Sequence, residues 1–392
     1  MNQSQLRKVL PWLAILISCV LYAAHFFLGG GINHFILDSA AYLQVASGEP
    51  SGVPFDIRIL TPFSSALIAR VSGISIPAAF QLLTPSVLFA SLLILRRCIK
   101  KRDGSPEWQA AVLLAFGCSL AVTFGYTPIL VDPTLLLIVC ITVSALDSGR
   151  LLLALALACL AVFTKEFGLF LGIVWSLYVY RLGYRRLALA GLTAPIATLL
   201  ILLVVRHSDV AGTFIGWRPY AFHYLFDYQL MVLRLRGPMS YTKLLYMGAW
   251  CGIWPVLLVA TLGIRSRSVQ SAVSDVFRIG LFISLLCLPL LLLGDWSRNL
   301  IVVVPFASVV ASGHPLARDR HFVLLLATGG LSTALARPFH GEPQAIAVLL
   351  PITAVSVISA GIMLFKLFQC CISTSSLPID RVFEQNAPSA IE

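Results

Sequence analysis

Residues Gly29–Arg70 read GGGINHFILDSAAYLQVASGEPSGVPFDIRILTPFSSALIAR and separate two long apolar runs. The segment is too polar to cross a bilayer and too rich in apolar residues to be a plain solvated loop. Its first part predicts a short amphipathic helix with Asp38 and Tyr42 four residues apart on one face. Glycine and proline residues then break the chain. A second short helix is predicted to begin with Thr61 as its cap and Pro62 in its first turn. The segment therefore predicts two short amphipathic helices at a membrane surface.

The same segment carries side chains suited to chemistry. Asp38 offers a carboxylate, Tyr42 a phenol and Arg58 a guanidinium group. A carboxylate accepts a proton, and arginine binds phosphate in a bidentate manner. These residues fit a catalytic platform, but they also fit a surface loop with a solvated acid and an ion pair. The charges of the other loops decide between the two interpretations.

The composition indicates a polytopic helical membrane protein. Of the 392 residues, 58% are hydrophobic and only 11% are charged, and the mean hydropathy is +0.90. Apolar runs long enough to span a bilayer recur, whereas the strict alternation of a β-barrel is missing. We therefore expect an all-α bundle of about twelve spans. They are predicted at 10–28, 75–95, 108–125, 127–146, 151–163, 167–180, 187–205, 244–262, 277–293, 299–313, 321–336 and 345–365.

The distribution of positive charge predicts the orientation. The net charge is +11, and most of the surplus basic residues lie in short loops, which indicates cytoplasmic loops and not a nucleic-acid surface. We expect both termini in the cytoplasm of a bacterial inner (plasma) membrane. Residues 1–366 form one transmembrane domain, with 29–70 as the first outer loop and 206–243 as a long outer loop. Residues 367–392 form a polar cytoplasmic tail.

Further charged residues fall at breaks between spans on the outer side. Asp132 precedes Pro133 at a helix start, where it either caps the helix or belongs to a site. Lys165 and Glu166 separate two apolar runs too short to cross a hydrocarbon layer of ~30 Å. Such charges either face a cavity within the bilayer or form an ion pair at the interface with a snorkelling lysine.

Arginines of the later outer loops extend this pattern. Arg218 and His223 lie among aromatic residues of the long outer loop, and Arg298 follows Asp295 by three positions. Arginines with aromatic residues suit a lipid headgroup or a sugar phosphate, although they are also typical of an aromatic belt. If the spans bundle compactly, these basic groups converge on one outer cavity, which suits an anionic ligand such as a phosphate.

The layout resembles the GT-C superfamily of membrane glycosyltransferases, in particular the polyprenyl-phosphate-sugar-dependent protein mannosyltransferase and aminoarabinose transferase types. The segments that carry the resemblance are LDSAAYLQVASG followed by PFDIRILTP, and the turns VDPT, TKEFG and GDWSRNL, between Leu10 and Pro305. The resemblance implies that Asp38 is the catalytic acid, with Arg58, Lys165 and Arg298 near the lipid-linked phosphate. The chain departs from the family in lacking an adjacent acidic pair around Asp38, which puts a divalent metal (Mg or Mn) in doubt.

We therefore expect an enzyme that moves a sugar from a polyprenyl-phosphate donor to an acceptor hydroxyl on the outer (periplasmic or lumenal) face, with inversion. The acceptor is a glycan, a lipid or a protein. Asp38 is the expected catalytic residue, and the expected substrate-binding residues are Tyr42, Arg58, Asp132, Lys165, Glu166, Arg218, His223 and Arg298. Two alternatives stay open. One is a transporter or flippase for an anionic or lipid-linked substrate, and the other is a lipid-linked glycan polymerase or ligase that uses the long outer loop.

Overall fold

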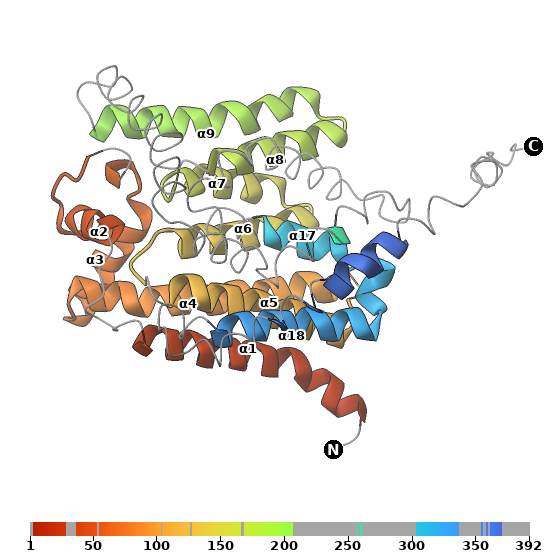
Figure 1. The fold of residues 1–392 in the computed structure, drawn as a ribbon. Coiled ribbons are helices and arrows are strands. Elements are labelled where there is room, and N and C mark those ends of the chain that lie inside the picture. The colour runs from red at the N-terminus through yellow and green to blue at the C-terminus, as the bar shows by residue number, and fades with distance from the viewer. Residues whose placement is uncertain are drawn as a thin grey trace, which may run out of the picture.

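The structure is a computed structural model that describes residues 3–28, 37–52, 55–102, 104–125, 128–165, 168–206, 256, 259–260, 303–336, 354–355, 358–359 and 361–370. Within these residues the regular secondary structure is entirely helical, which confirms the expected all-α class for the described part. Figure 1 shows long helices stacked side by side, from α1 at one edge to α9 at the other, with α2 and α3 gathered at one end of the stack.

The helices follow the apolar runs of the sequence. In chain order the described elements are α1 (Gln3–Leu28), α2 (Leu37–Ser47), the 3-10 helix η2 (Phe55–Ile57), α3 (Leu60–Ser72), α4 (Ile76–Lys101), α5 (Pro106–Phe124), α6 (Asp132–Asp147), α7 (Leu151–Val162), α8 (Gly168–Arg181), α9 (Arg185–Arg206), α17 (Val304–Ala311), the 3-10 helix η4 (Pro315–Arg318) and α18 (Arg320–Ala336). A further helix covers Gly361–Cys370.

Helix α5 lies at the centre of this arrangement. Of its most apolar window, 78% is buried, against 28% for α1 and for α9. Small residues allow the neighbouring helices to approach it closely. A Cβ atom added at Gly117 would lie 2.0 Å from Ser18 Oγ of α1, and one added at Gly330 of α18 would lie 2.5 Å from Ala115 Cα. Glycine at these two positions therefore sets the spacing of α1 and α18 against α5.

Helices α4 to α9 alternate in direction, so the stack has two ends (Figure 1). We call one of them the α2/α3 end. Four hydrogen bonds to main-chain carbonyls connect distant segments there: Ser39 Oγ to Ile129 O (3.2 Å), Leu60 N to Phe163 O (2.9 Å), Thr84 Oγ1 to Pro128 O (2.6 Å) and Arg206 Nε to Asp56 O (3.2 Å). The outer-loop segment of the sequence is thus attached to the residues before α6, to the end of α7 and to the end of α9.

The opposite end carries the α4–α5, α6–α7 and α8–α9 turns. Asp147 accepts ion pairs from Lys101 (2.9 Å) and Arg102, both at the end of α4. Glu107 of α5 pairs with Arg7 of α1 at 3.0 Å. Trp108 Nε1 donates a hydrogen bond to Ser312 Oγ (3.2 Å). These contacts tie the basic turns of the sequence into the fold.

The predicted spans agree with α5, α7, α8, α9 and α18 within two residues at each end, whereas α1 begins seven residues earlier, α4 ends six residues later and α6 begins five residues later than predicted. The predicted number of spans is not confirmed. Four described helices are long and apolar enough to cross a membrane: Gln5–Leu28, Ile76–Lys101, Pro106–Phe124 and Arg185–Arg206. Helices α7 and α8 have 12 and 14 residues, as short as the sequence predicted. Most of the expected span 244–262, all of 277–293 and much of 345–365 lie outside the described residues.

The expected cap of α3 is wrong, and of the two interpretations left open for Asp132 the structure excludes the helix cap. Ile59 occupies the N-cap position of α3 without a capping side chain, and Thr61 lies inside the first turn with its side chain buried. Val131 occupies the N-cap position of α6, and Asp132 is already the first helical residue. The physical reason is that both polar side chains turn towards the protein interior instead of back to the free main-chain N–H groups of the first turn.

The expected amphipathic character is also wrong for α2. Its buried side combines Ser39 and Tyr42 with Val45 and Ala46, so polar and apolar residues do not separate onto two faces. Tertiary contacts explain the difference, because α2 packs into the end of the stack with its polar groups hydrogen-bonded.

Helix α3 presents its apolar side outwards. Phe63, Leu67 and Val71 are exposed at a spacing of four residues, whereas Thr61 and Ser65 are buried. An apolar stripe that faces away from the protein suits contact with lipid.

Candidate functional site

The α2/α3 end brings together five of the predicted site residues. Asp38, Tyr42, Arg58, Asp132 and Lys165 lie on the elements that meet there. The remaining predicted site residues lie outside the described residues: Glu166, Arg218, His223 and Arg298.

Tyr42 and Arg58 form the first pair of the site. Arg58 Nη1 donates a hydrogen bond to the Tyr42 hydroxyl oxygen at 2.8 Å, and Tyr42 is 0% exposed. Phe55 packs against both, with its ring edge-to-face to Tyr42 (centroids 5.4 Å apart) and the Arg58 guanidinium 5.6 Å from the ring centroid. The cation is therefore held in place by a phenol and an aromatic face, which reduces the entropy it loses on binding an anion.

Asp38 belongs to the same side of α2 as Tyr42. The two residues are four positions apart on one helix, which brings their side chains to the same face. Asp38 is half-buried. The next residue, Ser39, donates its hydroxyl hydrogen bond to the Ile129 carbonyl, so the start of α2 is fixed against the segment that leads into α6.

Asp132 and Lys165 form the second pair. Lys165 Nζ lies 2.8 Å from Asp132 Oδ1, and the side chains are 12% and 1% exposed, respectively. The pair links the first residue of α6 to the break between α7 and α8. Asp132 is therefore not a helix cap, and Lys165 turns towards another helix instead of snorkelling to solvent. Removing one partner of such a buried pair leaves an uncompensated charge.

One hydrogen bond joins the segments that carry the two pairs. Leu60 N donates to Phe163 O at 2.9 Å. Arg58 is two residues before Leu60, and Lys165 is two residues after Phe163. Since consecutive Cα atoms are ~3.8 Å apart, the Cα atoms of Arg58 and Lys165 lie no more than roughly 20 Å apart. Two long basic side chains at that spacing can serve the same extended ligand.

An open apolar cavity of about 350 Å³ begins at this junction. Its lining comes from α3 and from the end of α7, namely Ile59, Leu60, Phe63, Ser64, Leu67, Leu160 and Phe163. The volume exceeds the ~150 Å³ that holds a benzene molecule in an engineered apolar cavity. The α2/α3 end therefore offers an apolar groove next in sequence to the Arg58 guanidinium and to the Asp132–Lys165 ion pair, a combination that suits an amphiphile with a phosphate headgroup.

Asp56 has a structural role that the sequence did not reveal. Its carboxylate accepts hydrogen bonds from Ser51 N (2.8 Å), Ser51 Oγ (3.1 Å) and Gly52 N (3.0 Å), and the residue is buried. A carboxylate whose oxygens accept three hydrogen bonds from its own loop organises that loop. Sequence reasoning also did not predict that Thr61 and Ser65 are buried. The signal was available, because these two residues are four positions apart on the side of α3 opposite to its apolar stripe.

The donor set of the described residues does not fit a divalent metal. No group of three or more His, Cys, Asp or Glu side chains gathers anywhere in that part of the chain. Near Asp38, Asp56 is occupied by loop hydrogen bonds and Asp132 by Lys165. The described residues therefore offer no set of ligands for the divalent metal (Mg or Mn) that the sequence left in doubt.

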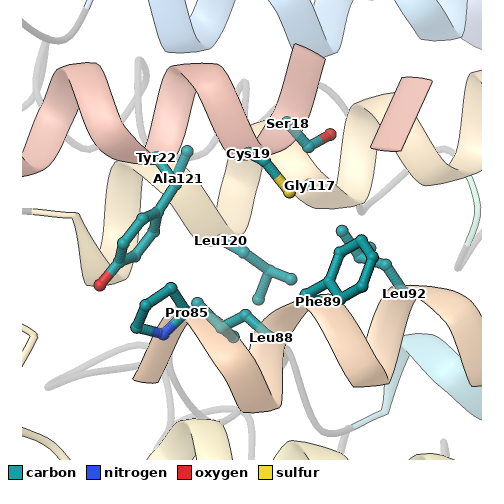
Figure 2. Close-up of a pocket in the computed structure, with 10 residues that line it drawn as sticks. All are labelled: Ser18, Cys19, Tyr22, Pro85, Leu88, Phe89, Leu92, Gly117, Leu120 and Ala121. Carbon is teal, nitrogen blue, oxygen red and sulfur yellow. The ribbon is translucent and has the colours of Figure 1, made fainter. Parts of the chain in front are cut away.

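A second cavity, of about 60 Å³, lies between α1, α4 and α5, and no residue of the candidate site lines it. Figure 2 shows its lining, with Tyr22 of α1, Pro85 and Phe89 of α4 and Gly117 of α5 around the space. The lining residues carry no charged group. This cavity lacks the cations and carboxylate of the candidate site.

Comparison with known proteins adds no assignment. No family model matches the chain, and no curated protein sequence matches it.

Proposed function

We propose that this chain is an integral-membrane glycosyltransferase. It transfers a sugar from a polyprenyl-phosphate donor to an acceptor hydroxyl at the α2/α3 end. The observation that carries the proposal is the placement of two held cations, Arg58 and Lys165, beside an apolar groove and the Asp38 carboxylate. Transfer from a lipid-linked donor needs three features in one place. These are an apolar surface for the lipid chain, cations for the phosphate and a base for the acceptor hydroxyl.

The proposed reaction is a single displacement. Asp38 takes the proton of the acceptor hydroxyl, and the acceptor oxygen forms a bond to the anomeric carbon. The bond from that carbon to the phosphate oxygen breaks, and the polyprenyl phosphate leaves with the electron pair. Arg58 and Lys165 stabilise its charge, an effect that is large where water is excluded. One displacement inverts the anomeric configuration.

The charge distribution supports the proposed orientation. Basic residues crowd the opposite end, including Arg97, Lys100, Arg185 and Arg186, and cytoplasmic loops are enriched in such residues. We accordingly place the opposite end in the cytoplasm and the α2/α3 end on the periplasmic or lumenal side, in a bacterial inner membrane. Four described helices long enough to span a bilayer agree with a membrane protein.

The test combines binding and transfer with purified protein. Polyprenyl phosphate binding is measured for wild type, Asp38→Asn, Arg58→Ala and Tyr42→Phe, and transfer is measured with a panel of labelled polyprenyl-phosphate sugars. Arg70→Ala is the matched control, since Arg70 is an exposed arginine of α3 at the same end. Asp38→Asn should bind normally and lose transfer by about 10²–10⁴-fold. Arg58→Ala should weaken binding by about tenfold.

Other outcomes would redirect the assignment. Absence of polyprenyl phosphate binding by the wild-type protein would remove the lipid-phosphate site. Near-normal transfer by Asp38→Asn would remove Asp38 as the base. If Tyr42→Phe weakened binding as much as Arg58→Ala, Arg58 would act by supporting α2 and not by contacting the phosphate.

A transporter or flippase is the second candidate, and the buried Asp132–Lys165 pair favours it. Ionisable residues at membrane depth often form substrate or proton pathways. Reconstituted protein that moves a labelled lipid-linked sugar between leaflets without consuming it would support this alternative, as would Asp132→Asn abolishing movement while Asp38→Asn leaves it intact.

A further inference from the structure

The turn between α8 and α9 exposes basic, aromatic and apolar side chains together. Tyr180, Leu182, Tyr184, Arg185 and Arg186 are all exposed. The Arg185 guanidinium lies 6.0 Å from the centroid of the Tyr180 ring. Tyrosine and arginine side chains favour the level of lipid headgroups, where an apolar body and a polar tip are both accommodated.

The described acids of the opposite end pair with other basic residues. Glu107 pairs with Arg7, Asp147 with Lys101 and Arg102, and Asp319 with Lys366. Across the described ranges, no acidic side chain forms an ion pair with Arg185 or Arg186. Within the described residues, the charge of these two arginines is therefore available to an external anion.

An exposed stripe of α9 continues from Arg185 into the membrane. Leu189, Leu192 and Ile196 follow it at steps of four, three and four residues, and all are exposed. At ~3.6 residues per turn these positions share one face, and eleven residues at ~1.5 Å each cover about 16 Å. That length matches one leaflet, which is half of a hydrocarbon layer of ~30 Å.

The other side of α9 is closed against α8, so the stripe points away from the protein. Ser176 Oγ donates a hydrogen bond to Ala188 O at 2.6 Å. A Cβ atom added at Gly191 would lie 2.4 Å from the Trp175 ring. This close packing fixes α9 in rotation and keeps Arg185 in line with the apolar stripe.

We infer that the α8–α9 turn and the exposed stripe of α9 bind an acidic phospholipid of the adjacent leaflet. Arg185 and Arg186 hold the headgroup phosphate, and one acyl chain lies along Leu189, Leu192 and Ile196. A soluble anion would not use the apolar stripe, and a zwitterionic lipid carries no net charge to balance two arginines. The site lies at the end opposite the proposed reaction and does not depend on it.

The experiment measures lipid binding to the purified full chain by native mass spectrometry. The probes are palmitoyl-oleoyl phosphatidylglycerol, the corresponding phosphatidylcholine, and a short-chain dihexanoyl phosphatidylglycerol. The variant is Arg185→Gln/Arg186→Gln. The control is Arg97→Gln/Lys100→Gln, which removes the same charge from exposed residues of α4 at the same end. The preceding residues on that face, Leu93 and Ala90, are partly buried, so these charges are not followed by an exposed apolar stripe. Arg185→Lys/Arg186→Lys keeps the charge of the turn.

The affinity for long-chain phosphatidylglycerol should fall about tenfold in the Arg185→Gln/Arg186→Gln variant. In the control and in the lysine variant it should stay within about twofold of the wild-type affinity. Phosphatidylcholine binding should change in none of them, and the short-chain lipid should bind wild type weakly. Equal losses in the variant and the control would show a general charge effect and overturn the site. Unchanged binding in Arg185→Gln/Arg186→Gln would overturn it as well. The lysine variant identifies a loss that comes from misfolding instead of charge.

Discussion

At the residue scale, the Asp132–Lys165 pair makes a sharp prediction about stability. Lys165→Met leaves the Asp132 carboxylate buried without its cation, and should lower the free energy of unfolding by about 3 kcal/mol. The double variant Asp132→Asn/Lys165→Met removes both charges and should recover most of that loss. Thermal unfolding in detergent measures both variants against wild type.

The control is the pair between Arg7 and Glu107, whose side chains are 51% and 33% exposed. Arg7→Met should cost at most ~1 kcal/mol, because solvent screens an exposed pair. A Lys165→Met variant as stable as Arg7→Met would show that the Asp132 carboxylate is solvated or neutral in the folded protein.

These residue pairs also mark what the sequence left undetermined. Asp132 and Lys165 are conspicuous as charges beside apolar runs, and Asp38, Tyr42 and Arg58 stand out in a polar segment. Which of these residues pair with one another depends on how the helices pack, because the paired residues are up to 33 positions apart in the sequence. No local sequence pattern encodes that packing. Sequence reasoning therefore located the candidate site but did not predict which residues pair within it.

At the element scale, the close approach of α1 to α5 makes Gly117 intolerant of a larger side chain. The added methyl group of Gly117→Ala would meet Ser18 Oγ at 2.0 Å and Ser18 Cβ at 2.4 Å. Beside the cavity in Figure 2, α1 must then shift, and overpacking of this kind costs about 1–3 kcal/mol. The midpoint of thermal unfolding in detergent should fall accordingly.

Gly361→Ala is the matched control, because a Cβ atom at Gly361 meets nothing within 4 Å. It should be neutral or stabilising by up to ~1 kcal/mol, as alanine favours a helix. Ser18→Gly combined with Gly117→Ala should restore stability. If Gly117→Ala behaved like Gly361→Ala, α1 would not be held against α5 as closely as the structure indicates.

The extent of each helix was more predictable than its orientation. Residues 151–163, 167–180 and 321–336 were expected as helices, and α7, α8 and α18 match them within one residue at each end, because the length of an apolar run is a local property. The buried faces of α2 and α3 were not predictable in the same way. Thr61 and Ser65 turn inwards while Phe63 and Leu67 turn outwards, since the surroundings of α3 decide which face is covered.

At the scale of the whole molecule, the alternation of helices predicts on which side of the membrane each turn lies. Ser72 at the end of α3 and Ser148 after α6 are both exposed. Between them the chain passes through α4, α5 and α6, an odd number of crossings. The 16 residues of α6 cover only about 24 Å, which makes α6 the shortest of the three helices. Whether Ser72 and Ser148 lie on opposite sides of the membrane therefore depends on α6 crossing it.

Single-cysteine reporters test this parity in a background without the nine native cysteines. With a membrane-impermeant maleimide on intact cells, Ser72→Cys should react and Ser148→Cys should react only after permeabilisation. The reverse pattern would keep the fold and invert the proposed orientation. Labelling of both reporters from the same side would mean that α6 does not cross, and the Asp132–Lys165 pair would then lie outside the membrane. Because serine and cysteine are nearly equal in size, the reporters leave the helix packing unchanged, and a difference in labelling reports the side of the membrane.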